Sequence, residues 1–446
     1  MCAIVGVINS KDAAKTAYYA LFSMQHRGQE SSGISSCDEN GIIKTIKASG
    51  LVTEVFGKDS FEILKGDMAI GHNRYATAGT QSLLDAQPVA VNYALGSLSL
   101  VHNGNLVNKD SVRNELINEG AIFATNMDTE NIVHLIARSH EEHLKDRIIA
   151  ALKKIVGAYC LLIQSRHKIF AIRDRYGVRP LSLGRLKDGG YIVASETCAF
   201  DLVEAEFIRD VRPGEMITFE RGKDEFVSEQ IFEPDPRICA FEYIYFARPD
   251  SVIEGKSVYE ARKRMGAALA RKSKVEADFV IPVPDSGVAA ALGYAKQSGL
   301  PFEAAIVRNH YVGRTFIEPS QEMRNLKVKL KLNPMSSVLK GKSVVVVDDS
   351  IVRGTTSKKM VDLLRHAGVS KIHFRVACPE LKFPERYGID TPSFDELISS
   401  KRSVEQVREY IGADTLEFLD IAELVGSLGD ERRYSLVSFD GDYFIK

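Results

Sequence analysis

The residues most able to do chemistry begin at the start of the chain. Cys2 follows Met1, and removal of Met1 would leave a thiol and a free α-amine on the same carbon atom. A chain's α-amine has an ordinary pKa of about 7.7–8.0, which lets it act as a base near neutral pH. A nucleophile that uses its own terminal amine as base is an established form of covalent catalysis. A cysteine here could equally begin a buried strand, so other residues must decide between the two interpretations.

Four polar stretches accompany Cys2, and they span residues 24–34, 71–77, 102–105 and 126–130. Each has a plain structural explanation by itself: Asn103-Gly104 is typical of a hairpin turn, Asp128 of a helix N-cap, and Arg74 of a surface charge. Together with residues 173–181 and 194–196, their order and spacing closely resemble the glutaminase domain of the N-terminal-nucleophile amidotransferases. The resemblance covers roughly residues 2–230.

This resemblance implies a role for each matching residue. The implied catalytic residues are Cys2, Asn103 and Gly104, and the implied glutamine-binding residues are Arg74, Asp128 and Arg27. The Cys2 thiol would attack the amide carbon of glutamine, while the Asn103 side chain and the Gly104 backbone N–H would stabilise the oxyanion. A guanidinium suits the substrate carboxylate, and a carboxylate suits the substrate ammonium. The products would be glutamate and ammonia.

A second set of motifs lies in the other half of the chain. Residues 344–347 are four valines typical of a buried strand, and they are followed by Asp348, Asp349 and a Gly-Thr-Thr turn that opens a helix. A helix N-terminus with small hydroxyl residues binds anions, and adjacent carboxylates can meet ribose hydroxyls or a hydrated Mg²⁺. Two acids after a strand can also be an exposed corner, but the string 344–357 is more specific. It resembles the signature of type I phosphoribosyltransferases, which bind 5-phosphoribosyl-1-pyrophosphate (PRPP).

The second resemblance implies a PRPP site and a magnesium site. The implied PRPP-binding residues are Asp348, Asp349, Ser350, Arg353, Gly354, Thr355, Thr356 and Ser357, and the implied Mg²⁺ ligands are Ser286, Asp348 and Asp349. Residues 282–287 resemble the family's pyrophosphate loop, and residues 310–317 resemble a mobile loop that closes on PRPP. Lys327, Lys329 and Lys331 alternate with apolar residues, a pattern that fits a solvated edge strand and phosphate binding equally well.

Glutaminase first and phosphoribosyltransferase second is the order found in glutamine phosphoribosylpyrophosphate amidotransferases. The resemblance implies transfer of ammonia from glutamine to C1 of PRPP, with release of pyrophosphate and glutamate and formation of 5-phosphoribosylamine, the first step of de novo purine synthesis. It also implies a closed passage for ammonia, inhibition by purine nucleotides, and a homodimer or homotetramer. Three alternatives are a PRPP-sensing regulator without turnover, an amidotransferase with another ammonia acceptor, and a salvage phosphoribosyltransferase that uses a free base.

Two different folds must position these residues. Before residue 230, short β-rich runs (3–8, 68–72, 97–102, 158–163, 169–172, 191–194 and 216–220) mix with helical patterns, which predicts an α+β N-terminal-nucleophile domain of layered sheets with helices. After Pro234-Asp235-Pro236, strands and helices alternate, which predicts an α/β parallel sheet. We therefore expect a glutamine amidotransferase domain at 2–231 and a phosphoribosyltransferase domain at 232–446.

Composition limits the remaining classes. The chain has 446 residues, with 58 Lys plus Arg and 59 Asp plus Glu, so its net charge of −1 gives no reason to expect nucleic acid or an anionic membrane as a partner. No run of about 18 uncharged apolar residues and no signal-peptide pattern is present, which predicts a cytoplasmic protein.

The six cysteines contain no CxxC pair and are expected to be reduced. Some members of the family carry an iron–sulfur cluster on four cysteines. Only Cys239 lies at a cluster position here, Glu385 appears at a second, and no cysteine follows Cys378. Since one thiol cannot hold a cubane, we predict that no iron–sulfur cluster is present.

Overall fold

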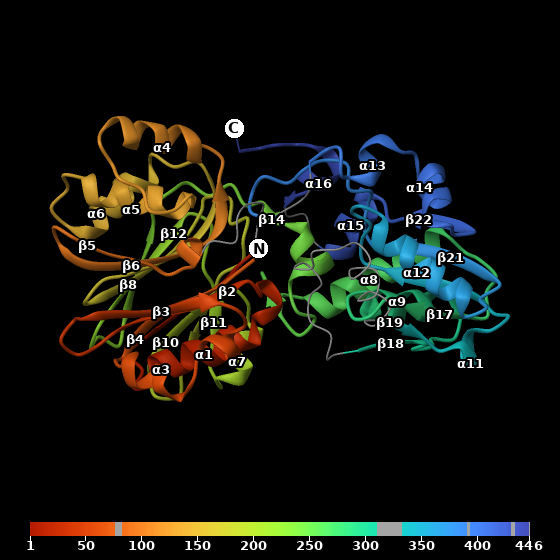
Figure 1. The fold of residues 1–446 in the computed structure, drawn as a ribbon, viewed down its shortest axis with the longest axis horizontal. Helices are drawn as coiled ribbons and strands as arrows, with labels where there is room; N and C mark the ends of the chain where they lie inside the picture. The colour runs from red at the N-terminus through yellow and green to blue at the C-terminus, as the bar shows by residue number, and fades with distance from the viewer. Residues whose placement is uncertain (76–82, 310–331, 390–392, 430–432, 446) are drawn as a thin grey trace.

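The structure is a computed structural model that describes residues 1–75, 83–309, 332–389, 393–429 and 433–445. The chain forms two halves that lie side by side, the first coloured red to yellow-green and the second green to blue (Figure 1). The N-terminus lies where the two halves meet (Figure 1). Cys2 is therefore placed at the junction, although it belongs to the first half in sequence.

The first half contains two antiparallel sheets. The seven-stranded sheet has the order β11-β9-β10-β1-β4-β2-β3 and the six-stranded sheet has the order β13-β12-β8-β7-β6-β5. The first sheet comprises β1 (Ala3–Ile8), β2 (Ser31–Cys37), β3 (Ile43–Ser49), β4 (Met68–Arg74), β9 (Ser182–Arg185), β10 (Tyr191–Ala194) and β11 (Glu206–Asp210). The second comprises β5 (Val89–Tyr93), β6 (Gly96–Leu106), β7 (Gly157–Gln164), β8 (Lys168–Arg173), β12 (Glu215–Glu220) and β13 (Phe226–Gln230).

Helices connect the strands of both sheets. They are α1 (Ala13–Ser23), η1 (Gln25–Arg27), α2 (Val52–Val55), α3 (Lys58–Ile63), η2 (Leu83–Asp85), α4 (Lys109–Asn118), α5 (Asp128–Arg138), α6 (Leu144–Leu152) and α7 (Cys198–Leu202). Ile4 and Ile8 of β1 pack in the core between the sheets, while Val5 and Val7 pack against α1. Because successive strand residues point to opposite faces, a strand covered on both sides is apolar throughout, and all six residues of β1 are buried.

The second half is built on a parallel sheet of four strands in the order β17-β20-β21-β22. Its elements up to this sheet's second strand are β14 (Ile238–Cys239), η3 (Glu242–Phe246), β15 (Val252–Ile253), β16 (Lys256–Ser257), α8 (Val258–Lys272), β17 (Phe279–Pro282), α9 (Val288–Ser298), β18 (Ile306–Arg308), β19 (Leu332–Pro334), α11 (Ser336–Leu339) and β20 (Ser343–Asp348). The rest are α12 (Thr355–His366), β21 (Lys371–Val376), α13 (Ile398–Lys401), α14 (Val404–Ile411), β22 (Thr415–Phe418), α15 (Ile421–Leu428), β23 (Tyr434–Ser435) and α16 (Val437–Asp440).

The layered first half and the parallel-sheet second half agree with the predicted fold classes, but two local predictions need correction. Asn103-Gly104 is not a turn, because β6 continues through both residues and pairs them with Cys160 and Tyr159. The sequence also predicts a strand near Ala304–Arg308 among the alternating strands and helices of the second half, but β18 lies outside the parallel sheet and pairs antiparallel with β19. In both cases a tertiary partner that the local pattern does not reveal decides the conformation.

One hydrophobic cluster spans the junction of the two halves. Met1, Ala158 and Val178 of the first half belong to the same buried cluster as the apolar residues of the parallel sheet. The backbone N–H of Cys239 also donates to the Val178 carbonyl across the junction, at 3.1 Å. The domain boundary at residue 231 remains a prediction, and it falls between the end of β13 and the start of β14. Within the described residues, no helix has the length and apolar character needed to cross a membrane.

Candidate active site

A pocket of about 180 Å³ contains most of the residues predicted for glutamine. Cys2, Arg74, Asn103, Gly104 and Asp128 all line it, although they come from the chain start, β4, β6 and α5. β1 lies beside β4 in the first sheet, and β6 belongs to the facing sheet, so the pocket forms where the ends of the two sheets meet. The fold therefore brings together five residues that are spread over 126 positions of sequence.

Cys2 carries the most accessible thiol in the molecule. The other five cysteines are buried, whereas Cys2 is partly exposed. Burial raises the pKa of Cys160 and of Cys239 to about 12, and it also raises the pKa of Cys37, Cys198 and Cys378. Since the thiolate is the reactive form of cysteine, these five side chains are poor nucleophiles. Met1 precedes Cys2 in the structure and is itself buried, at 1% exposure.

The two polar atoms of the Asn103 side chain have different surroundings. Its Oδ1 accepts a hydrogen bond from the Cys2 backbone nitrogen at 3.1 Å. Its Nδ2 is buried and has no hydrogen-bond partner among the described residues. A buried donor without a partner is costly, and at a pocket wall it is suited to an oxygen that arrives with a ligand.

Gly104 needs the absence of a side chain. Its φ is +151°, and a Cβ atom would lie 2.0 Å from the Ala158 carbonyl oxygen. On its other side, a Cβ on Gly388 of the second half would lie 3.0 Å from the Gly104 Cα. Asn105 also donates to the Arg386 carbonyl at 2.8 Å. The pocket wall at Gly104 is thus in contact with both halves of the chain.

Asp128 lies opposite, at the first turn of α5. It accepts the Leu106 backbone N–H at 2.9 Å, and its Oδ1 lies 3.4 Å from Nδ1 of His102. Burial raises the pKa of Asp128, but His102 and the Leu106 amide lower it more, so the pKa stays below its usual value. Asp128 therefore presents a carboxylate to the pocket at neutral pH, as binding of an ammonium requires.

Arg74 lies at the end of β4, where acidic residues surround its guanidinium. Nη1 donates to the Asp85 carbonyl, Nη2 lies 3.6 Å from the Asp85 carboxylate, and Nε lies 3.5 Å from Glu30. Both ion pairs are longer than a hydrogen bond, so the guanidinium can still bind a carboxylate in the pocket.

Arg27 lies behind Cys2 and does not line the pocket, and its role in binding glutamine stays a prediction. Its side chain is fully buried and pairs with Glu196 at 2.5 Å and with Glu242 at 2.9 Å. Its Nε donates to the Cys2 carbonyl at 3.0 Å. The physical reason is that two buried carboxylates attract the cation inward, away from the space where a substrate would bind.

The second set of predicted residues gathers at the end of β20. Asp348 is the last residue of this strand, both acids are 7% exposed, and the Asp349 N–H donates to Asp348 Oδ1 at 2.9 Å. Burial and the neighbouring Asp349 raise the pKa of Asp348 well above its usual value. Burial also raises the pKa of Asp349, against the opposing effects of the Ser286 and Ser350 hydroxyls and of Arg262. Such a pair favours either a proton or a cation.

The N-terminus of α12 follows directly. Gly354 is its N-cap residue with a φ of +73°, Thr355 and Thr356 are exposed, and Ser357 is buried. Arg353 is exposed and pairs with Glu396 at 3.0 Å. Exposed hydroxyls and unpaired backbone N–H groups at a helix start suit a phosphate. Predicted residues 348–357 thus run from the end of β20 through one loop into the first turn of α12, at the carboxyl end of the parallel sheet.

The predicted pyrophosphate loop follows β17, the strand next to β20. A hydrogen bond from the Ser286 hydroxyl opposes the rise in the pKa of Asp349, so this loop lies at the same sheet edge as the two acids. Asp285 in this loop pairs with Arg308. The predicted loop at 310–317 and Lys327, Lys329 and Lys331 lie outside the described residues.

The two predicted remnants of a cluster site lie beside the same arginine. Glu385 pairs with Arg179 at 3.2 Å and accepts the Ile389 N–H at 2.7 Å. Burial raises the pKa of Cys239, and the charges of Arg179 and Glu385 act on the same thiol. Within the described ranges, no group of three or more His, Cys, Asp or Glu side chains could hold a metal ion. The expected absence of an iron–sulfur cluster stays a prediction.

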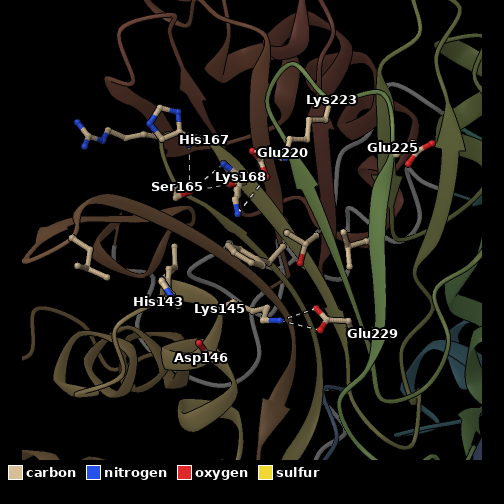
Figure 2. A pocket seen from close by; sticks show the side chains of 16 residues that line it. His143, Lys145, Asp146, Ser165, His167, Lys168, Glu220, Lys223, Glu225 and Glu229 are labelled. Carbon is tan, nitrogen blue, oxygen red and sulfur yellow. Dashed lines mark hydrogen bonds and ion pairs between the residues drawn. The ribbon is translucent and has the colours of Figure 1, made fainter.

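The larger cavity of the first half lies elsewhere and contains no predicted site residue. It has a volume of about 590 Å³ and lies between the start of α6 and the strands β8, β12 and β13. Figure 2 shows two pairs of opposite charge that face one another, Lys145 with Glu229 at 2.9 Å and Lys168 with Glu220 at 3.4 Å. These pairs neutralise the charges that they join, and the buried Thr218 hydroxyl, which also lines the cavity, has no hydrogen-bond partner among the described residues.

Sequence reasoning missed the buried ions around Cys2. Glu196 and Arg179 lie in motifs that carried the resemblance, so the motifs indicated that they matter but not why. Glu242 and Arg262 gave no signal, because a charged residue in an apolar stretch shows neither its burial nor its partner.

The chain has close relatives. Residues 72–201 match the glutamine amidotransferase domain family, and residues 256–400 match the phosphoribosyl transferase domain family. The chain is 48% identical to amidophosphoribosyltransferase 1, chloroplastic, of Arabidopsis thaliana, over 100% of this chain and 79% of the relative. It is 46% identical to amidophosphoribosyltransferase of Bacillus subtilis, over 99% of this chain and 94% of the relative.

Two solved structures have the same fold. One is the allosteric regulatory enzyme of purine biosynthesis, with a TM-score of 0.95 and 45% identity over 100% of this chain and 96% of that one. The other is glutamine PRPP amidotransferase from B. subtilis complexed with ADP and GMP, with a TM-score of 0.94 and 45% identity over 100% of this chain and 98% of that one.

Proposed function

The chain belongs to the amidophosphoribosyltransferase family, whose members transfer ammonia from glutamine to PRPP at the start of purine synthesis, and we propose that Cys2 and the Asp348–Asp349 pair divide this reaction between two sites. This family was predicted from the motifs, and the relatives confirm it. The observation that carries the division of labour is the separation of the two residue sets. The glutamine set lines one pocket in the first half, and the PRPP set lies on one sheet edge in the second.

In the first step, the Cys2 thiol attacks the amide carbon of glutamine. The free α-amine that forms when Met1 is removed acts as the base, and Asn103 Oδ1 accepts a hydrogen bond from this nitrogen. The unpartnered Asn103 Nδ2 and the Gly104 N–H stabilise the oxyanion. Arg74 binds the carboxylate of glutamine and Asp128 binds its α-amine. Ammonia leaves, and water releases glutamate from the thioester.

In the second step, ammonia attacks C1 of PRPP as pyrophosphate departs, which gives 5-phosphoribosylamine. Asp348 and Asp349 bind the ribose diol. The 5′-phosphate is bound at the start of α12 by Ser350 and by the segment from Arg353 to Ser357. Free ammonia is mostly ammonium in bulk water, so a passage closed to water is expected between the two sites.

The donor set at this second site fits Mg²⁺. Two buried carboxylates with raised pKa values repel each other, and a cation relieves this repulsion. Asp348, Asp349 and the Ser286 hydroxyl would hold the ion together with oxygen atoms of the substrate. When bound, Mg²⁺ neutralises negative charge that builds up on the departing pyrophosphate.

The relatives support a proposal on regulation. A B. subtilis relative is complexed with ADP and GMP, and another relative is described as allosteric. These descriptions support our proposal that purine nucleotides inhibit this chain as well. The homodimeric or homotetrameric state and the cytoplasmic location stay predictions.

The test is a coupled assay with glutamine, PRPP and Mg²⁺, in which glutamate and pyrophosphate are followed together. We expect PRPP to stimulate glutamate release strongly, with pyrophosphate and glutamate formed one for one. If glutamate release did not depend on PRPP and no pyrophosphate formed, the acceptor of ammonia would be a different compound. Intact-mass spectrometry of the same preparation should show loss of the Met1 mass in the active protein.

A further inference from the structure

Glu242 belongs to the second half of the chain, yet its carboxylate lies beside the nucleophile of the first half. Its side chain is fully buried at the start of η3. Its Oε2 accepts from Arg27 Nη1 at 2.9 Å and its Oε1 accepts from Arg27 Nη2 at 3.0 Å. The third nitrogen of the same guanidinium, Nε, donates to the Cys2 carbonyl at 3.0 Å. One planar group therefore joins Glu242 to the backbone of Cys2.

The bidentate pair fixes the direction of this contact. A guanidinium is planar, so two parallel bonds to Glu242 determine the plane in which Nε lies. Glu196 adds a third bond, to Nη1 at 2.5 Å. The Arg27, Glu196 and Glu242 side chains are all fully buried, so water does not compete for these bonds. Rotation of Arg27 away from Cys2 would break several charged bonds at once.

Cys2 is thus held at both ends of its backbone. Its nitrogen donates to Asn103 at 3.1 Å, and its carbonyl accepts from Arg27 at 3.0 Å. The first contact comes from the sheet of the first half, and the second depends on an acid of the second half. With both ends fixed, the aim of the thiol depends on the accuracy of both contacts.

The segment that carries Glu242 is itself held from the side of the parallel sheet. Arg262 is buried on α8, and its Nε and Nη2 donate to the carbonyls of Tyr243 and Ala247, each at 2.8 Å. Buried hydrogen bonds of Arg262 therefore hold the segment that carries Glu242 against α8, and the charge of the same Arg262 opposes the rise in the pKa of Asp349.

We propose that Glu242 is a positioning residue for Cys2, which acts through Arg27 and lets the second half of the chain complete the geometry of the nucleophile. This inference rests on the proposed function and deepens it. It adds a residue without substrate contact to the glutamine reaction, and it explains why two carboxylates draw Arg27 behind Cys2.

The test is Glu242→Gln in the full chain, because this change keeps the shape of the side chain and removes its charge. The matched control is Glu254→Gln, since Glu254 also pairs across the two halves, with Arg173 at 2.6 Å, but has no contact with Cys2 or Arg27. Four quantities are measured: glutamine-dependent turnover, ammonia-dependent PRPP turnover, the rate of Cys2 alkylation by iodoacetamide, and the melting temperature.

In Glu242→Gln we expect glutamine-dependent kcat and Cys2 alkylation to fall by about 10²-fold, the cost of a misplacement near 1 Å. The KM for glutamine and the ammonia-dependent turnover should change by less than about threefold, because neither depends on the aim of the thiol. Glu254→Gln should leave both turnovers and the alkylation rate near those of the unmodified protein.

Two outcomes would overturn the inference. Unchanged glutamine turnover in Glu242→Gln would remove the positioning role, and an equal loss of both turnovers with a lowered melting temperature would leave a purely structural pair. If Glu242→Gln does not fold, Arg27→Lys tests the same link, and full glutamine turnover in that variant would also refute it. Unmodified protein that does not hydrolyse glutamine would instead contradict the proposed function.

Discussion

At the scale of single residues, each site contains a group that is costly to the fold and useful to a ligand. Asn103 Nδ2 is buried without a partner among the described residues, and Asp348 lies buried against a second acid. Neither arrangement stabilises a ligand-free protein. Both costs are relieved when a substrate supplies the missing partner, which leads to two predictions.

We expect Asn103→Ala to lower glutamine-dependent kcat by about 10²–10³-fold, because one of the two oxyanion donors is lost. Ammonia-dependent turnover should be spared, since it does not use this pocket. Steady-state kinetics with each nitrogen source checks the prediction, with Cys2→Ala as the baseline for complete loss. Asn92→Ala, an exposed amide on β5, is the control and should leave both rates unchanged. A drop in ammonia-dependent turnover in Asn103→Ala would argue against two separable sites.

We expect Asp348→Asn to weaken PRPP turnover and yet to stabilise the ligand-free protein. Its raised pKa means that the carboxyl stabilises the fold below its unfolded-state pKa and loses this contribution as pH rises through the folded-state value. The gain in melting temperature should therefore be larger at pH 8 than at pH 5, and a gain of about 1 kcal/mol corresponds to about 2–4 °C. Differential scanning calorimetry at both pH values measures it.

Asp362→Asn, an exposed change on α12, is the control and should give no pH-dependent gain. A melting temperature that falls in Asp348→Asn at pH 8 would show that the ionised pair is already compensated within the protein.

At the scale of secondary structure elements, the proposed PRPP site depends on how one strand is connected to one helix. β20 ends at Asp348 and α12 begins at Thr355, with Gly354 between them in the left-handed region. An L-residue there costs about 1–2 kcal/mol. A Cβ on Gly354 would also lie 2.5 Å from Ile398 Cδ1 and 3.2 Å from the Tyr410 ring. The loop conformation that aims the backbone N–H groups thus depends on this glycine.

We expect Gly354→Ala to raise the KM for PRPP by about tenfold, which is equivalent to about 1.4 kcal/mol of lost binding. Gly299→Ala is the matched control, because Gly299 has a similar φ of +79° at the end of α9 and an added Cβ meets nothing within 4 Å. Both variants should lose similar backbone stability, but only Gly354→Ala should lose PRPP affinity. An equal rise in the KM for PRPP in the two variants would show that general backbone strain, rather than a change in the phosphate loop, causes the rise.

At the scale of the whole molecule, the proposed glutamine pocket is completed by residues far along the chain. Gly388 lines it from the second half and lies against Gly104, 284 positions earlier in the sequence. Its φ of +109° and the close approach both exclude a side chain. The two halves therefore share this pocket wall as well as a hydrophobic cluster.

We expect Gly388→Ala to lower glutamine-dependent turnover by about tenfold, because a displaced Gly104 aims its N–H away from the oxyanion. Ammonia-dependent turnover should be kept. Gly412→Ala at the end of α14 is the control, since its φ is +80° and its added Cβ would make only an ordinary contact, 3.6 Å from Val361 Cγ1. Steady-state kinetics of both variants check the prediction. Equal glutamine-dependent turnover in the two variants would mean that Gly104 can shift without loss of activity.

The sequence by itself determined the chemistry and the two fold classes. Cys2, Asn103, Asp348 and Asp349 stand in motifs whose local order encodes a function, and strand and helix patterns follow from the periodicity of apolar residues. Motifs and apolar periodicity are local along the chain, so they can be recognised without a structure.

Only the tertiary structure decided what lies next to each of these residues. Asn103-Gly104 proved to be strand because β7 pairs with it, and Arg27 proved to lie behind Cys2 because Glu196 and Glu242 attract it there. This strand pair joins residues more than 50 positions apart and these ion pairs join residues more than 160 positions apart, and no local pattern records such a partner. The physical reason is that burial and charge pairing are properties of the folded molecule.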